Sequence, residues 1–173
     1  MIIDILARLY RHHGWANKAF LDTLAALPEN GPAEPRATAL KRMRHIEIVG
    51  QIFAAHLTGR AHSYLSDSVE ETPHLPSLRH DTEACDGWYI DYLSDRDPDT
   101  LSEEIAFTFT DGDRGRMSRG EILLHVATHA AIHRGEITQL LSSAGIDAPW
   151  DTFAVHLHQI EPARRVAALA KAG

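Results

Sequence analysis

The sequence predicts an all-α protein: an up-down four-helix bundle with a short β-hairpin between the third and fourth helices. Four long segments repeat apolar residues at spacings of three and four, which is the pattern of one helix face. A short segment between the third and fourth of these has β-branched and aromatic residues followed by Asp-Gly, typical of a strand entering a tight turn. Long amphipathic helices in this number usually pack as a bundle.

The first helix is expected over residues 3–27. Its apolar seam alternates spacings of three and four, and consists of Ile3, Leu6, Tyr10, His13, Asn17, Phe20, Leu24 and Leu27. Pro28 and the Asn30-Gly31-Pro32 turn end the helix. Two polar residues, His13 and Asn17, interrupt the middle of the seam. They either form a hydrogen-bonded pair in the core or line a polar cavity.

A second helix is expected from about Glu34 to Leu57, with Gly59 as its C-terminal stop. Its apolar side contains Leu40, Met43, Val49, Phe53 and Leu57. His45 precedes Ile48, Val49 and Ile52 by three, four and seven residues, so it shares their face and should point inward. The following residues, 60–76, contain two prolines and several serines and are expected to form a loop.

The third helix is expected from about Ser77 to Arg96, where Asp97-Pro98 ends it. Its apolar side consists of Leu78, Cys85, Trp88, Tyr89, Tyr92 and Leu93. Residues 105–110 then change to a strand pattern that runs into the Asp111-Gly112 turn. Residues 113–117 are long enough to return as a second short strand.

The fourth helix begins with a capping box, because Ser118 is followed three residues later by Glu121. It is expected to continue to about Ser143, with Gly145 as the stop. A short helix is expected over residues 151–158, and after Pro162 an alanine-rich helix in the tail. Neither an internal repeat nor a linker divides the chain, so we expect a single domain over residues 1–173.

The composition argues against several functions. The formal net charge is −7 and no stretch is rich in Lys and Arg, so we expect no nucleic-acid partner. No run of 18 apolar residues exists that would span a membrane. Asp4 and Arg8 interrupt the first apolar run, which therefore does not read as a signal peptide. Cys85 is the single cysteine and fits a reducing compartment, so a cytoplasmic location is expected.

Histidine is unusually frequent, with 12 residues scattered through the chain. His125, His129 and His133 follow one another at spacings of four, which places them on one helix face. Two imidazoles at this spacing can reach one ion at about 2.0–2.1 Å. The outer two lie two turns, about 11 Å, apart. At most two of the three can therefore bind one ion, and a third protein ligand must come from another helix.

We expect these histidines to face the core or to lie close beside it. The alternative is that they bind no metal and are either exposed or hydrogen-bonded within the core. Their side of the helix also carries Ile122, Val126, Ile132 and Leu140. Burying several imidazoles is costly unless each has a partner, and a metal ion would be a shared partner. Ala130 follows His129, so the motif is not the thermolysin type, in which a glutamate next to the first ligand is the general base.

Residues 125–137, His-Val-Ala-Thr-His-Ala-Ala-Ile-His-Arg-Gly-Glu-Ile, resemble the last-helix signature of the DinB/YfiT-like family, roughly His-x-x-x-His-x-x-x-His-Arg-Gly-Gln. Glu136 stands where that family often has Gln. Tyr10, Trp15, Ala16 and Asn17 are similar to the family's first-helix Tyr-x-x-x-Trp-Ala-Asn pattern, with one more residue between Tyr and Trp. His45-Ile46 lies where the family carries its second-helix ligand. The resemblance covers residues 3–158 and leaves out the tail from Glu161.

The resemblance implies a four-helix bundle, often a homodimer, that holds one divalent ion, commonly nickel or zinc. Position by position, the metal ligands it implies are His45, His129 and His133. His125 is then not a metal ligand. We expect it either to support the ligand side chains without contacting the metal or only to pack against its neighbours. Arg134 and Glu136 are further candidates for supporting residues, and we expect Arg134 to form an ion pair with Glu47 or Glu136.

Three neutral ligands would leave coordination positions open, which suits catalysis better than structure. The wider superfamily resembles thiol-dependent transferases and isomerases, so the leading hypothesis is activation of a small-molecule thiol for transfer to an electrophile. Tyr10, His13 and Asn17 are candidates to line the cavity, and no general base stands out. The alternatives are a metal-dependent hydrolase that uses metal-bound hydroxide and a non-catalytic, stress-related scaffold that only binds metal.

Overall fold

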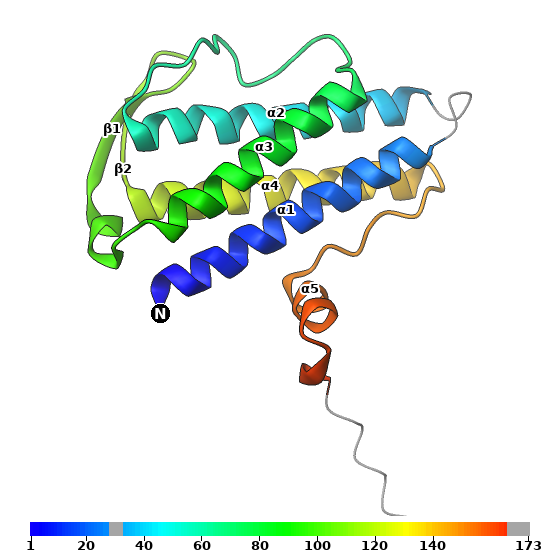
Figure 1. The fold of residues 1–173 in the computed structure, drawn as a ribbon. Coiled ribbons are helices and arrows are strands. Elements are labelled where there is room, and N and C mark those ends of the chain that lie inside the picture. Colours follow the sequence, from blue (N-terminus) through cyan, green and yellow to red (C-terminus); the bar gives the residue numbers. More distant parts are fainter. Residues whose placement is uncertain (28–32, 166–173) are drawn as a thin grey trace, which may run out of the picture.

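The computed structural model describes residues 1–27 and 33–165, and its long helices form a bundle (Figure 1). The helices are α1 (Ile2–Ala26), α2 (Ala33–Thr58), α3 (Leu75–Ser94) and α4 (Arg119–Ser143). This confirms the predicted all-α fold class with a hairpin between the third and fourth helices. The turn expected at residues 30–32 and the tail helix expected in 166–173 lie outside the described residues.

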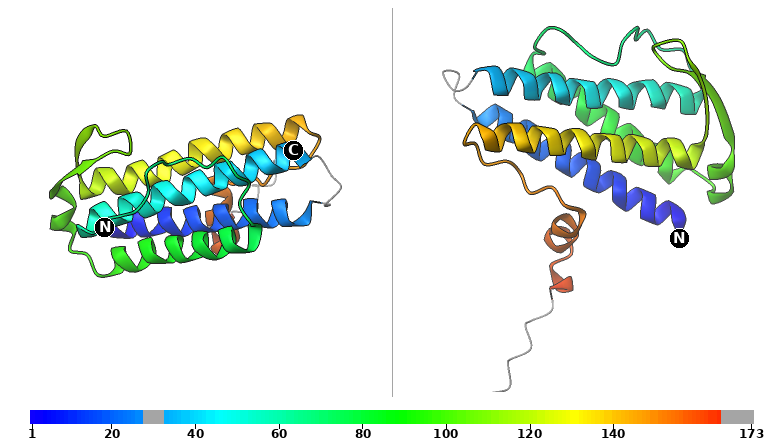
Figure 2. Two further views of the ribbon diagram at one scale, coloured as in Figure 1. Left: turned by 90° about the horizontal axis from the view of Figure 1, so that it is seen from above. Right: turned by 180° about the vertical axis from the view of Figure 1, so that it is seen from behind.

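The long helices pack in a ring in which α1 contacts α3 and α4, and α2 also contacts α3 and α4. In all three views of the ribbon, α1 and α4 run in one direction while α2 and α3 run in the other (Figures 1 and 2). The direction order is therefore up, down, down, up, and not the simple up-down alternation expected from the sequence. It arises because residues 59–74 return along the bundle before α3 begins. Gly59, with φ of +65°, lets the chain leave α2 in a left-handed conformation.

The ends of the helices follow local chemistry. The predicted capping box is present: the Ser118 hydroxyl accepts from the backbone N–H of Glu121, whose carboxylate accepts from the backbone N–H of Ser118. The third helix begins at Leu75, two residues before the expected Ser77, because Pro76 is compatible with the first helical turn. That helix ends at Ser94, two residues before the expected Arg96.

The hairpin consists of β1 (Glu104–Thr108) and β2 (Arg114–Ser118), paired antiparallel with Phe107 opposite Gly115. The first strand is shorter than the predicted 105–110 segment. A Cβ at Gly115 would lie 2.8 Å from the ring of Phe107, so the close approach of that ring requires glycine. Phe107 packs edge-to-face on Phe53 of α2, with ring centroids 5.4 Å apart, and this contact joins the hairpin to the bundle.

The short helix predicted at residues 151–158 is α5 (Phe153–Ile160), which lies against α1 below the bundle in Figure 1. Its buried residue, His156, contacts Trp15 and His12 of α1, with ring centroids 5.1 and 5.7 Å apart. A single 3-10 turn, η2 (Pro162–Arg164), follows.

The core has two apolar parts. One lies toward the hairpin and includes Leu6, Tyr10, Val49, Phe53, Tyr89, Leu93, Phe107, Ile122 and Val126. The other lies toward the opposite end and includes Phe20, Leu24, Leu40, Met43, Ile46, Leu78, Ile137 and Leu141. Beside these apolar parts lie buried polar residues of α1, α3 and α4. They form a polar layer that we define as His13, Asn17, Asp86 and Arg134.

Hydrogen bonds link the whole polar layer. The Asn17 amide donates to both carboxylate oxygens of Asp86 at 3.1 Å, and His13 Nε2 lies 3.0 Å from Asp86 Oδ1. Arg134, only 1% exposed, donates from Nη1 to Asn17 Oδ1 at 2.9 Å and from Nε to Asp151 Oδ2 at 2.7 Å. The layer therefore connects α1, α3, α4 and the segment before α5.

The expectation that Arg134 pairs with Glu47 or Glu136 was wrong. Arg134 faces α1, whereas Glu136 lies 3.1 Å from Arg42 Nε and Glu47 lies 3.1 Å from Arg44 Nη1. The reason is angular, because residues next to each other on a helix point about 100° apart. His133 faces α2, so Arg134 cannot.

The first prediction concerns the buried guanidinium. We expect Arg134→Met to destabilise the protein by about 3 kcal/mol, because it leaves the Asp151 carboxylate and the Asn17 amide oxygen without their donor. Equilibrium urea unfolding of metal-free protein measures this free energy. Arg114→Met on β2 removes an exposed arginine and should change it by less than about 0.5 kcal/mol. Equal midpoints for the two variants would contradict the role assigned to Arg134.

The second prediction concerns Glu47, which is 3% exposed. Burial raises the pKa of its carboxyl group from 4.5 to about 6, although Arg44 partly offsets this. Because the folded pKa is the higher one, the contribution of this carboxyl group to stability is greatest below pH 4.5 and is lost as the pH rises through 6. Glu47→Gln should remove this loss, about 2 kcal/mol, from the unfolding free energy between pH 4.5 and 7. Glu83→Gln, at an exposed carboxylate of α3, is the matched control. The prediction is wrong if the unfolding free energies of wild type and Glu47→Gln change in parallel with pH.

Candidate metal centre

Three histidines from two neighbouring helices meet at one point. His45 comes from α2, and His129 and His133 come from successive turns of α4, which packs against α2. Their Nε2 atoms form a nearly equilateral triangle. The separations are 3.0 Å for His45 and His129, 3.1 Å for His45 and His133, and 3.0 Å for His129 and His133. All three side chains are partly buried.

The other ring nitrogens show which tautomer two of these histidines adopt. His45 Nδ1 lies 2.7 Å from the backbone oxygen of Asp67, and His133 Nδ1 lies 2.8 Å from Glu136 Oε2. A carbonyl oxygen and a carboxylate can only accept, so both Nδ1 atoms carry the proton. In the neutral form of both rings, the Nε2 atoms of His45 and His133 then present lone pairs to each other at 3.1 Å. That arrangement is unfavourable unless a cation lies between them.

This donor set fits a divalent metal ion. Three nitrogen atoms at these separations can all reach an ion at about 2.0–2.1 Å, the usual zinc–imidazole distance. Metal-binding histidines also commonly donate their second N–H to a carboxylate or a backbone carbonyl, as His133 and His45 do here. Among the residues that the structure describes, these three could hold a metal ion.

Burial keeps one of the three imidazoles, that of His129, neutral. Burial, followed by the nearby rings of His133 and His45, lowers the pKa of His129 from 6.5 to about 3. His129 is therefore uncharged at neutral pH, and its lone pair is available to a ligand. The hydrogen bond from His133 lowers the pKa of Glu136 below its usual value, so that carboxyl group remains an acceptor.

His125 lies beside this cluster but outside it. Its ring centroid is 5.6 Å from that of His129 and 4.9 Å from that of Phe53. Burial lowers its pKa, so it is a neutral packing residue next to the centre. Ile132, expected on the same side of α4, is instead 65% exposed, because it lies 100° from His133 on the outer face of the helix.

The first-helix candidates lie in the core. The Tyr10 hydroxyl donates to the backbone oxygen of Leu123 at 2.9 Å, and its ring stacks on Tyr89 at 4.7 Å. His13 and Asn17 belong to the polar layer, which corresponds to the hydrogen-bonded core pair considered for them above. The cavity beside His45 has a different lining, so none of the three forms its wall.

Two residues that sequence reasoning missed support the cluster. Asp67 supplies the carbonyl oxygen bonded to His45, and Arg42 holds Glu136 through its Nε. Arg42 was detectable, because it lies three residues before His45 and so shares its helix face. Asp67 lies in an irregular loop and acts through its backbone, so no side-chain pattern could have indicated it.

Two cavities adjoin the histidine face of α2. One, of about 390 Å³, is lined by His45, Thr38, Lys41, Arg42, Asp67 and Ser68 among others. The other, of about 50 Å³, is lined mainly by Val49, Ile52, Phe53, Phe109 and the side chain of His56, and again by Asp67.

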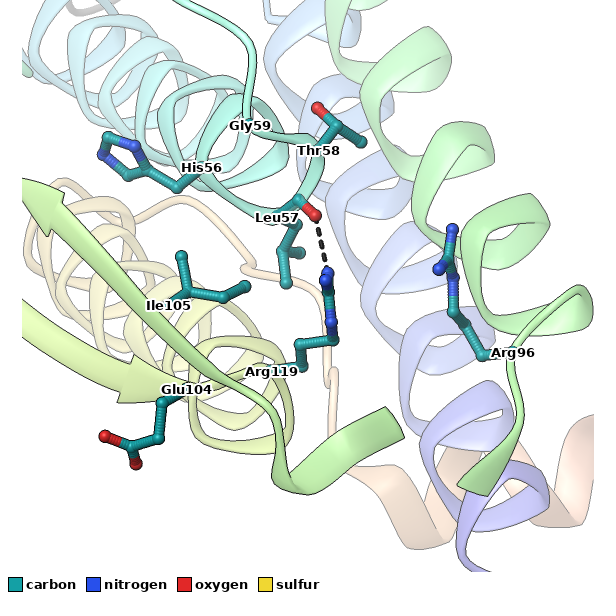
Figure 3. Close-up of a pocket in the computed structure, with 8 residues that line it drawn as sticks. All are labelled: His56, Leu57, Thr58, Gly59, Arg96, Glu104, Ile105 and Arg119. Carbon is teal, nitrogen blue, oxygen red and sulfur yellow. Dashed lines mark hydrogen bonds between the residues drawn. The ribbon is translucent and has the colours of Figure 1, made fainter. Parts of the chain in front are cut away.

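A third cavity, of about 520 Å³, lies at the C-terminal end of α2 next to β1 (Figure 3). There Arg119 reaches across to donate to the backbone oxygen of Leu57 at 2.6 Å. Its α2 residues begin at His56, three turns or about 16 Å along the helix from His45. This cavity is therefore separate from the histidine cluster.

Within the described ranges, no helix combines the length and apolar character needed to cross a membrane. No curated protein matches the chain. The DinB family matches residues 2–164, which is six residues further than the resemblance noted in the sequence. With nearly the whole length matched, and with the expected bundle and histidine cluster in place, the chain belongs to the DinB family.

Proposed function

We propose that the protein binds one divalent metal ion through His45, His129 and His133 and uses it to activate a small-molecule thiol for transfer to an electrophile. One observation carries the metal site. Three Nε2 atoms lie 3.0–3.1 Å apart, and the hydrogen bonds at Nδ1 of His45 and His133 direct unprotonated nitrogens at the same point. Nickel and zinc both suit such ligands.

The chain's own groups hold this arrangement in place. Asp67 and Glu136 fix the orientation of His45 and His133, and Arg42 in turn holds Glu136. A divalent ion there would make the proton of a bound thiol or water easier to remove. With three neutral protein ligands, coordination positions remain for a substrate.

The choice of a thiol rests on the similarity of the wider superfamily to thiol-dependent transferases. In the reaction proposed, a sulfur–carbon bond forms to the electrophile, a leaving group departs with the bonding electrons, and the thiol proton passes to solvent. Hydrolysis by metal-bound hydroxide and a purely structural metal are the competing functions, and the activity experiment below separates all three. The homodimer and the cytoplasmic location remain predictions of the sequence.

The third prediction is metal binding. Calorimetric titration of metal-free protein with zinc or nickel should give one ion per chain. His45→Ala should weaken the affinity for the metal by at least about 100-fold, because removing a metal ligand lowers the affinity more than removing a residue that hydrogen-bonds to a ligand. His80→Ala, which removes an exposed histidine of α3, should leave the affinity unchanged. The metal site does not exist if wild type takes up no stoichiometric ion or if both variants bind alike.

The fourth prediction is thiol-dependent turnover. Metal-loaded protein with glutathione or cysteine and an activated aryl chloride should form the coloured aryl thioether and release chloride. Chelation or His133→Ala should lower the rate at least about 100-fold, whereas His80→Ala should not.

The same samples are tested with a nitrophenyl ester in the absence of thiol. Ester turnover that thiol does not increase would replace the transferase proposal with hydrolysis. No turnover of either kind, together with loss of cooperative melting on metal removal, would favour the scaffold.

A further inference from the structure

We propose that the histidine face of α2 is a binding groove for an organic anion that carries an apolar group. Its carboxylate, or a similar anion, binds at Lys41 and Arg42, and its apolar group lies at Phe53 and Phe109. The position of the reacting atom between these ends rests on the proposed function, whereas the binding itself does not.

The first support is the alignment of the groups along one helix face. Thr38, Arg42, His45, Val49 and Phe53 follow one another at spacings of three and four, so they form a stripe on α2. From residue 42 to residue 53 the helix rises about 16 Å. The histidine cluster lies between the ends of this stripe, nearer to the cationic one.

The cationic end is rich in hydrogen-bond donors. The cavity of about 390 Å³ is lined by Thr38, Lys41, Arg42 and Ser68 among others, whose side chains carry hydroxyl, ammonium and guanidinium groups. Its volume lies within the usual range of small-molecule sites. Glu136 lies 3.1 Å from Arg42 Nε, and among the described residues no second carboxylate pairs with this guanidinium, so its terminal nitrogens can donate to a ligand. Within the described residues, no carboxylate lies within 4.0 Å of the Lys41 ammonium group.

The apolar end is small and partly open. The cavity of about 50 Å³ is lined by Val49, Ile52, Phe53 and Phe109 together with the polar residues His56, Asp67 and Thr110. It has room for the last few carbon atoms of an alkyl chain. Phe109 follows β1 and is 43% exposed, so a large ring covers the cavity without being part of the core. An exposed phenylalanine beside an apolar cavity is available to contact a bound apolar group.

Asp67 joins the two ends, because it lines both cavities. Its backbone oxygen is bonded to His45, so this part of the loop is fixed beside the histidine cluster. The Asp67 carboxylate is the acidic group in the donor-rich lining, opposed by Lys41 and Arg42. With Glu136 at Arg42 counted, the charges balance, so it is the surplus of N–H and O–H donors and the ammonium group of Lys41 that favour an anion over a cation.

The fifth prediction tests the groove without metal. Metal-free protein is titrated calorimetrically with octanoate and, separately, with 1-octanol, which has the same chain and no charge. Octanoate should bind at least about fivefold more tightly. Lys41→Gln should weaken octanoate binding about fivefold and leave octanol unchanged. Phe109→Ser should weaken both about threefold, since it removes apolar contact from each.

Lys18→Gln, on α1, is the matched control for loss of one positive charge and should bind octanoate like wild type. Circular dichroism of each variant shows that the fold is retained. The proposal is overturned if octanoate binds no better than octanol, or if Lys41→Gln and Lys18→Gln have equal effects. The titration contains no metal, so a failure to bind octanoate would not argue against the metal site. In the same way, a failure to bind metal would not affect the octanoate result.

Discussion

The buried guanidinium of Arg134 is the constraint on which the rest of the molecule depends. It donates to Asn17 of α1 and to Asp151 before α5, and Asn17 in turn donates to Asp86 of α3. A charge with so little exposure has one favourable orientation, since turning α4 would break these bonds inside the core. The rotation of α4 about its own axis is therefore fixed.

That rotation determines where the neighbouring histidine points. His133 precedes Arg134 by one residue and therefore lies about 100° around the helix, which directs it at α2 once Arg134 faces α1. His129, one turn earlier, shares that direction. The polar layer and the histidine cluster thus lie on two sides of α4. The hydrogen bonds of the polar layer fix the direction in which the histidines point.

Much of the fold follows from the sequence because its signals are local. The capping box at Ser118, the stop at Gly59 and the Asp-Gly turn each specify a boundary within a few residues. The meeting of His129 with His133 follows from their spacing of four. The approach of His45 followed from the family resemblance, because a contact between residues 84 apart has no local signal.

What the sequence could not supply depends on the path of the chain. The parallel course of α2 and α3 is set by residues 59–74, whose sequence does not specify a direction. The partner of Arg134 depends on where residue 151 lies after the last long helix has ended. The support given to His45 by Asp67 comes from a main-chain oxygen, which every residue type carries.

This last feature has a consequence for how the protein can diverge. Because a carbonyl oxygen holds the His45 ring, position 67 keeps that function with any side chain that leaves the loop path intact. Yet the same residue lines two cavities. The backbone at this position can therefore keep the imidazole of His45 oriented while its side chain changes. A substitution there can alter the cavity lining without disturbing the histidine cluster.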